Sequence, residues 1–204
     1  MQQPVQQMDL VAAHMLAPAA TLRVLRHPQP PALGSPELER LRQRCLGRGA
    51  APTFMCYGRR CTVPRLELLF APTEYRFSGR VLAPEPDPDP LVQQCLDLAN
   101  AHSPGWDYDG ALVNLYRSGA DYVSEHRDDE PALAKGAPIF TFVFGPAQRP
   151  FQVRCPGGLR NFDLHHGMVG VMEGERFQEL CTHGVPRRAG VDKYRLSITV
   201  RKFV

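Results

Sequence analysis

The sequence predicts a mainly β fold with flanking helices (α+β), arranged as an antiparallel sandwich or jelly roll. Helical patterns come early in the chain. Short β-branched and aromatic segments separated by Gly/Pro turns follow from about residue 110. Strands and helices do not alternate, which disfavours a parallel doubly wound sheet. At 204 residues, 43% of them hydrophobic, the chain is long enough for one domain with a hydrophobic core.

The first fifty residues are expected to be only partly ordered. Residues 1–34 are rich in Gln, Ala and Pro and show little periodicity, which favours partial disorder. The stretch SPELERLRQRCLG then predicts a short helix, because Ser35 can cap it and Pro36 suits its first turn. We therefore expect residues 1–50 to form an N-terminal extension, partly flexible with a short helix, ahead of a domain over residues 51–204.

A second helix is predicted after a proline-rich connector. The segment PEPDPDP (84–90) alternates proline with acid and suits neither a helix nor a central strand, so it predicts a stiff linker. Asp89 and Pro90 then begin a helix whose apolar residues share one side.

The strand patterns that follow are ALVNLYR, IFTFVFG, PFQVR, GMVGVM and YRLSITVRKF. Because side chains alternate along a strand, Arg195, Thr199 and Arg201 lie on one face of the last segment, opposite its apolar residues. Asn114 and Tyr116 share a face in ALVNLYR in the same way. If both polar faces look into one barrel, they form an anion pocket suited to carboxylates. The alternative is the solvated outer face of an antiparallel sheet.

A metal site is predicted from EHRDDE and CTHGVP. His126 and Asp128 are two residues apart, so in an extended chain they project to the same side and can bind one ion. The candidate third ligand is His183, and two histidines with one carboxylate are typical of non-haem Fe(II) oxygenases. His165 and His166 could compete as ligands. Surface polar residues or a structural histidine remain the alternative for the His126–Asp128 pair.

Charge and cysteine usage restrict the protein class only loosely. A formal charge of +3 permits an anionic partner without requiring one. The six cysteines form no CxxC pair, which disfavours a zinc ribbon and favours reduced thiols in an intracellular compartment. No apolar run approaches the ~18 residues of a membrane span, and the first residues lack the form of a signal peptide.

The order of these motifs resembles one known family. HxD, a distal histidine and a closing strand with the spacing Rx5R are similar to the AlkB family of Fe(II)/2-oxoglutarate-dependent dioxygenases. NLYRSGADYVSEHRDDEPALAKGAPI resembles the core of its eukaryotic nucleic-acid dealkylating members, and VPR, FSG, LHHGMVGVMEG and RLSITVRKF follow in the family's order. The resemblance covers roughly residues 54–204. It implies a double-stranded β-helix preceded by a nucleotide-recognition hairpin region over residues 51–83.

The resemblance also implies cofactors and their ligands. His126, Asp128 and His183 match the Fe(II) ligands, with 2-oxoglutarate and O2 as cosubstrates and ascorbate as a helpful additive in vitro. The residues that match the cosubstrate pocket are Asn114, Tyr116, Arg195, Thr199 and Arg201. One of the two arginines pairs with the cosubstrate carboxylate, and the other lies near the iron and the substrate.

Substrate contacts are implied in the same way. The residues matching substrate-binding positions are Tyr57, Arg65, Tyr75, Phe77, Asp129 and Glu130. Phe77 would stack on an extruded base, and Tyr57 would fill the gap it leaves in a duplex. Ordinary packing is the alternative for both. Cys181 and Thr182 stand where duplex-repair members carry aromatics, which leaves the preferred lesion open.

The expected function is oxidative demethylation of N1-methyladenine and N3-methylcytosine in DNA, a direct-reversal repair. The alternatives are demethylation of RNA by the same chemistry and a catalytically inert nucleic-acid binding module. The expected partner is alkylated DNA, or RNA, with no membrane. We expect a monomer inside the cell, in the nucleus.

Overall fold

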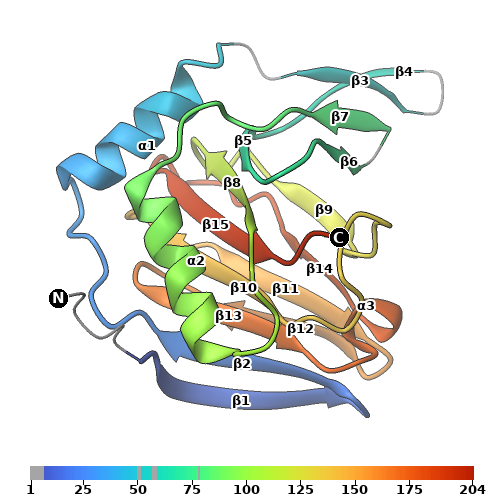
Figure 1. Cartoon of the computed structure of the whole chain (residues 1–204). Helices are drawn as coiled ribbons and strands as arrows, with labels where there is room; N and C mark the ends of the chain where they lie inside the picture. The colour runs from blue at the N-terminus through green and yellow to red at the C-terminus, as the bar shows by residue number, and fades with distance from the viewer. Residues whose placement is uncertain (1–6, 50–51, 57–58, 78) are drawn as a thin grey trace, which may run out of the picture.

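Two antiparallel sheets packed face to face form the body of the molecule (Figure 1). The computed structural model describes residues 7–49, 52–56, 59–77 and 79–204. The larger sheet runs, in spatial order, β1 (Asp9–Ala17), β2 (Ala20–Arg26), β13 (Met168–Glu173), β10 (Ile139–Phe144), β15 (Arg195–Arg201), β8 (Gly110–Tyr116) and β5 (Leu66–Phe70). The smaller sheet runs β12 (Gly158–Asp163), β11 (Pro150–Cys155), β14 (Thr182–Val185) and β9 (Val123–His126). The predicted mainly β, antiparallel fold is therefore confirmed.

Two short hairpins lie beside the end of the larger sheet that carries β5 (Figure 1). They are β3 (Thr53–Cys56) with β4 (Arg59–Thr62), and β6 (Tyr75–Phe77) with β7 (Arg80–Leu82). The predicted hairpin region thus forms strands. Tyr57 lies outside the described residues, so its predicted role as a wedge stays a prediction.

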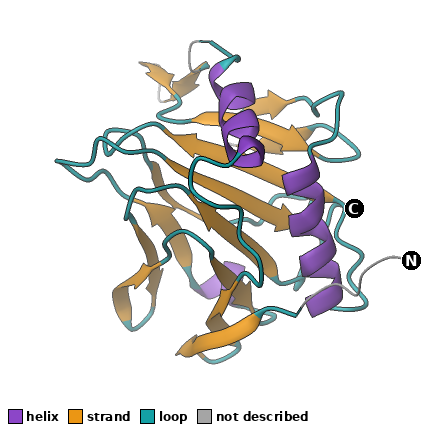
Figure 2. Cartoon of the chain, turned by 90° about the vertical axis from the view of Figure 1, so that its left-hand side faces the viewer, coloured by secondary structure: helices purple, strands orange, loops and turns teal. Residues whose placement is uncertain are grey.

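The two predicted helices cover the outer face of the larger sheet (Figure 2). They are α1 (Pro36–Leu46) and α2 (Pro90–His102). The Asp89 side chain caps α2 by accepting a hydrogen bond from Leu91 N at 2.9 Å, and Ser35 caps α1. A third helix, α3 (Phe177–Leu180), is a single turn, too short for a periodic pattern to predict. No helix in the described part of the chain is long and apolar enough to cross a membrane.

The faces of β15 are divided as the alternation predicts, and both are buried. Leu196, Ile198 and Val200 pack toward the helices in the main hydrophobic core. Arg195 and Arg201, 1% and 5% exposed, lie on the opposite face, between the two sheets. The polar face is therefore interior, and the alternative of a solvated outer face is excluded.

The expectation of a partly flexible segment before residue 35 is wrong for residues 9–26. These residues form β1 and β2, and β2 pairs with β13 from Thr21 to Arg26. Leu22 and Val24 are buried between the sheets. The alternation in ATLRVLR was a strand signal, but the Gln/Ala/Pro-rich composition around it masked that signal. The N-terminal segment is thus continuous with the larger sheet.

The expectation of reduced thiols throughout is also wrong for one pair. Cys155 at the end of β11 and Cys181 just before β14 form a disulfide, with a Cα–Cα distance of 4.3 Å. They are 26 residues apart and meet only because β11 and β14 are neighbours in the sheet. Cys45 and Cys95 are buried free thiols.

We predict that His27 makes stability depend on pH. Burial, and then the nearby His166, lowers the pKa of His27 from 6.5 to about 4. The unfolded chain therefore binds the proton first as the pH falls, and the free energy of unfolding should drop between about pH 6.5 and 4, by at most about 3 kcal/mol from this group. Urea unfolding of the wild type and of His27→Gln across this range measures the effect. Equal pH dependence in both proteins would contradict it.

Candidate metal and cosubstrate site

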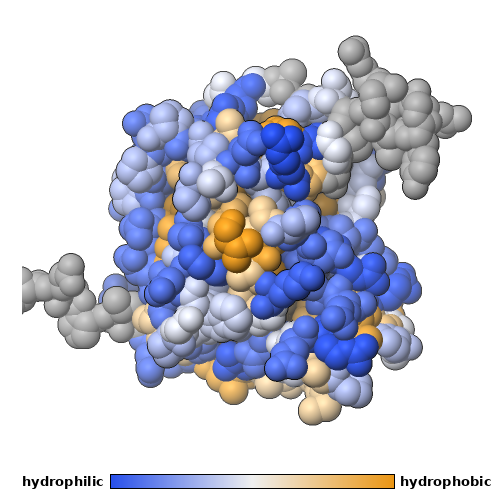
Figure 3. Space-filling view, turned by 45° about the vertical axis from the view of Figure 1, so that its right-hand side comes forward, coloured by the Kyte–Doolittle hydropathy of each residue, from blue (hydrophilic) through white to orange (hydrophobic). Residues whose placement is uncertain are grey.

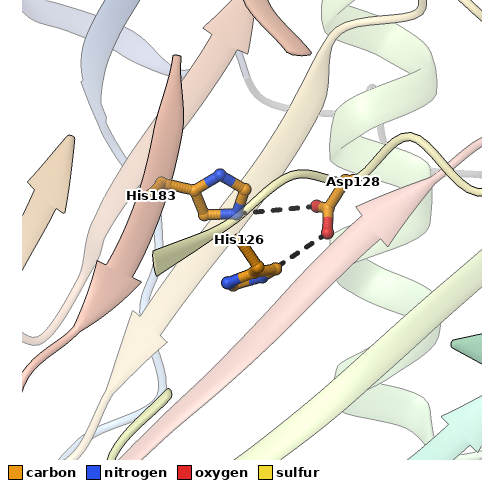
Figure 4. Close-up of side chains that lie close together, drawn as sticks. All are labelled: His126, Asp128 and His183. Carbon is orange, nitrogen blue, oxygen red and sulfur yellow. Dashed lines mark ion pairs between the residues drawn. The ribbon is translucent and has the colours of Figure 1, made fainter. Parts of the chain in front are cut away.

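Three residues from two neighbouring strands and one loop converge at the end of the smaller sheet (Figure 4). His126 ends β9 and lies directly opposite His183 of β14 in the strand register. Asp128 follows in the loop, with one carboxylate oxygen 3.6 Å from Nε2 of His126 and the other 3.7 Å from Nε2 of His183. One donor atom from each residue lies within 4.8 Å of the other two. These distances exceed a hydrogen bond and allow all three side chains to reach one ion. His165 and His166 lie outside this cluster of described residues.

Gly184 allows the two histidine strands to approach each other. A Cβ atom at this position would lie 2.8 Å from the Val123 carbonyl oxygen of β9, closer than real Cβ contacts. The pairing of β9 and β14 is irregular at this point, between His183 and Val185. The glycine after the histidine in CTHGVP is a sequence signal for this close contact that the pattern of metal ligands alone does not reveal.

The charges around the cluster suit a cation. Burial alone would raise the pKa of Asp128, but the Arg201 guanidinium and the two imidazoles hold it well below its usual value. Burial, and then His126, lowers the pKa of His183 to about 3, so its imidazole is neutral. Nδ1 of His126 lies 2.9 Å from the Ser124 carbonyl oxygen, which assigns the proton to Nδ1 and leaves Nε2 free as a ligand. One carboxylate and two imidazole rings therefore face one point, a set of ligands suited to Fe(II).

Arg201 links the ligand loop to the centre of the larger sheet. Its Nη2 donates to both oxygens of Asp128 at 2.9 Å, and its Nε donates to one of them at 3.1 Å. Burial lowers the pKa of this guanidinium, but Asp128 raises it by more, so the pair stays charged. Arg201 thus touches the carboxylate of the cluster directly.

The residues predicted for the cosubstrate line one small cavity between the sheets, the inner cavity. Its lining includes Asn114, Tyr116, Arg195, Thr199 and Arg201, together with His126 and His183. Thr141 of β10 also lines it, a position that sequence reasoning missed although it is the one polar residue in IFTFVF. The structure therefore brings the whole predicted pocket together beside the histidines.

Arg195 is suited to bind a carboxylate in the inner cavity. It is 1% exposed, and its Nε and Nη2 have no hydrogen-bond partner among the residues that the structure describes. Burial lowers its pKa to about 10, which leaves it protonated at neutral pH. A buried guanidinium with free donors is costly unless an anion pairs with it. This fits one carboxylate of 2-oxoglutarate.

Arg65 lies in the same wall and not on an open surface. It is 9% exposed, donates from Nε to the Asn114 side-chain oxygen at 2.7 Å, and pairs with Glu67 at 2.6 Å. The sequence placed it near phosphate or bases. A substrate contact for Arg65 stays a prediction, and the structure shows that it would have to be made from inside the cavity.

A second cavity, of about 500 Å³, is lined by Asp128 and Arg201 among others, and is called the loop cavity. Most of its lining comes from residues 127–130, 133–137, 174–175 and 177–179, and includes Asp129 and Glu130. Small-molecule sites are commonly of this size. Two of the predicted base-recognition residues therefore border a space next to the metal ligands.

Tyr75, Phe77 and Glu130 form one cluster beside this loop. The Tyr75 hydroxyl donates to Glu130 at 2.7 Å, and the rings of Tyr75 and Phe77 are stacked with centroids 4.7 Å apart. Tyr75 is 1% exposed and packs against its neighbours in the protein, whereas Phe77 is half-buried. Base stacking by Phe77 stays a prediction.

The fold and the site together define the class of protein. Residues 33–201 match the 2OG-Fe(II) oxygenase superfamily, and the chain belongs to this family. That family is one of Fe(II)- and 2-oxoglutarate-dependent oxygenases. A solved structure of OsALKBH1 has the same fold, with a TM-score of 0.56 and 18% identity over 94% of this chain and 100% of that one. The jelly-roll prediction is therefore confirmed.

Within that superfamily the chain is a member of the AlkB family, close to the eukaryotic dealkylases. It is 30% identical to human DNA oxidative demethylase ALKBH2, over 76% of this chain and 63% of that protein. It is also 30% identical to human alpha-ketoglutarate-dependent dioxygenase alkB homolog 3, over 68% of this chain and 51% of that protein. It is 27% identical to Arabidopsis thaliana DNA oxidative demethylase ALKBH2, over 74% of this chain and 56% of that protein. The chain thus spans between half and two thirds of these three relatives.

We predict that Arg195→Met abolishes the stabilisation given by 2-oxoglutarate. Removing one member of a buried charge pair costs about 2–5 kcal/mol of binding, a loss of roughly 30-fold or more. Without ligand the variant should be as stable as the wild type or more so, because it removes a buried charge with free donors. Thermal unfolding with Mn(II), with and without 2-oxoglutarate, measures both effects.

The matched control for this test is Arg154→Met, on the exposed side of β11, where the arginine pairs with Glu125. It should respond to 2-oxoglutarate as the wild type does. A normal ligand-induced shift in Arg195→Met would contradict the assignment of this residue.

Proposed function

We propose that this protein removes N-linked methyl groups from bases in DNA by oxidation, with N1-methyladenine and N3-methylcytosine as substrates, as a direct-reversal repair. One observation carries the proposal. The His126, Asp128 and His183 cluster lies between an arginine-lined inner cavity and a loop that bears Asp129 and Glu130. Similarity to proteins named as DNA oxidative demethylases supports the choice of substrate.

His126, Asp128 and His183 would hold iron(II), and Arg195 would bind a carboxylate of 2-oxoglutarate with Asn114 alongside. Iron bound there, with 2-oxoglutarate and O2, supplies the oxidation that turns an N-methyl into an N-hydroxymethyl group, with succinate and CO2 as coproducts; loss of formaldehyde then restores the base. The protein's part is to hold the methyl carbon near the metal and to keep water out of the buried inner cavity.

The loop beside the metal would recognise the damaged base. The carboxylate of Asp129 is exposed and has no partner among the described side chains, so it can accept a hydrogen bond from an exocyclic amine or face a cationic methylated base. Phe77 would stack on the base once it leaves the helix. The face seen in Figure 3 is largely hydrophilic around a small apolar patch. Such a surface is suited to bind a charged polymer such as nucleic acid.

The test is mass spectrometry of methylated oligonucleotides incubated with protein, Fe(II), ascorbate and 2-oxoglutarate. Single- and double-stranded DNA and RNA of one sequence should be compared. We expect loss of 14 mass units per lesion, about the mass of one CH2 group, with DNA converted faster than RNA, and no conversion by His126→Ala, which lacks one metal ligand. Faster conversion of RNA would favour the RNA demethylase, and no conversion of any substrate by the wild type would favour the inert binding module.

We predict that Phe77→Ala lowers kcat/KM on methylated DNA by roughly 5- to 100-fold, since stacking on a base contributes about 1–3 kcal/mol. Binding of Mn(II) and 2-oxoglutarate should not change, because Phe77 lines neither the metal cluster nor the inner cavity. Val81→Ala on the adjacent strand β7, with Val81 52% exposed, is the control. An unchanged kcat/KM in Phe77→Ala would leave only the packing role for this ring.

Other parts of the expected function belong to the same proposal. They are a nuclear location, where a repair enzyme would meet its DNA, and a monomeric state. A wedge role for Tyr57 predicts that Tyr57→Ala loses activity on duplexes and keeps it on single strands.

A further inference from the structure

Gln178 makes a hydrogen bond to the main chain of a metal-ligand residue. Its side-chain oxygen accepts from Asp128 N–H at 2.9 Å, across 50 residues of sequence. Gln178 lies in α3, and both residues line the loop cavity, so the bond joins its two walls. This contact involves neither the carboxylate nor the bound groups themselves.

The part of the loop that carries Asp128 has few other hydrogen bonds to its main chain. After His126 the chain leaves the sheet, and apart from strand pairing the Gln178 bond is the one hydrogen bond that the main chain of residues 127–129 makes to other described residues. The far end is held differently. Ala134 N donates to the Lys202 carbonyl at 2.9 Å, and Val204 N donates to the Ala132 carbonyl at 3.0 Å.

The segment that carries Gln178 is itself well packed. Phe177, next to it, is 2% exposed and packs between the sheets. Cys181, three residues after Gln178, donates from its N–H to the Phe177 carbonyl at 2.9 Å and is tied to Cys155 by the disulfide. The chain then enters β14, which carries His183. The bond to Asp128 N therefore couples the loop of one ligand to the segment that supplies another.

Arg201 alone does not fix where the carboxylate sits relative to the imidazoles. It holds both oxygens of Asp128, so it favours any position of the side chain that keeps those bonds. Restraining the peptide of Asp128 removes that remaining freedom. Ordering a ligand before the ion arrives avoids part of the entropic cost of binding.

We propose that Gln178 is a positioning residue that presets Asp128 for the metal by holding its main-chain N–H. The proposal rests on the metal site and not on the nucleic-acid substrate, so a failed demethylation assay leaves it standing. Partners of this kind, outside the ligand set, change metal affinity by about 10- to 100-fold when they are removed.

The test compares Gln178→Met with Gln178→Glu. Methionine keeps an unbranched side chain of similar length and lacks the acceptor, whereas glutamate keeps an acceptor oxygen. We expect Gln178→Met to weaken Co(II) and Mn(II) binding by at least about 10-fold and to alter the ligand-field absorption of bound Co(II). Gln178→Glu should restore both to near the wild-type result. Hydrogen exchange of segment 127–133 in the metal-free protein should rise in Gln178→Met only.

Gln152→Met is the matched control, because Gln152 on β11 bonds to Asn161 of the neighbouring strand and lines neither cavity. It should bind Co(II) as the wild type does, and thermal unfolding without metal checks that each variant is folded. Wild-type affinity in Gln178→Met would overturn the proposal. Equal losses in the Met and Glu variants would overturn it as well, since they would assign the effect to packing and not to the hydrogen bond.

Discussion

The site depends on a pair of opposite charges buried between two sheets. Arg201 and Asp128 are each about 5% exposed and are joined by several hydrogen bonds. Removing two charges from water costs several kcal/mol per ion, and such a pair persists only where hydrogen bonds and further charges compensate. Asp128 is thereby ionised beside two imidazoles. His183 is neutral, so its ring can offer a nitrogen to a metal ion. It completes a set of three ligands that can bind one cation.

Strand register brings the donors together. His126 and His183 face each other across β9 and β14, with ring centroids 4.3 Å apart. Opposite residues of paired strands are the closest neighbours that a sheet offers, so one register places two ligands at once. The third ligand comes from the loop that leaves β9, and its distance from the pair is set by Arg201 on one side and by the contacts of that loop on the other.

Strand β15 connects this site to the stability of the whole fold. It lies inside the larger sheet between β10 and β8, and its apolar face packs into the core beneath α1 and α2. Its other face supplies Arg195, Thr199 and Arg201 to the inner cavity. The same seven residues thus contribute to the core and to the site, which gives the guanidiniums a rigid base and keeps them out of water.

Local patterns were enough to predict much of this protein from the sequence. Caps at Ser35 and Asp89 located the helices, and alternation along β8 and β15 assigned the polar face correctly, because these signals act within a few residues. The spacing of His126 and Asp128, with His183 as the candidate third ligand, led to the three side chains that converge, and the family resemblance supported that choice. The tertiary structure alone decided that β2 pairs with β13, that Cys155 meets Cys181, that Arg65 is buried against Asn114 and that Gln178 reaches Asp128. Each of these contacts joins segments far apart in the chain, and no local period encodes such pairings, which arise only when the sheets assemble.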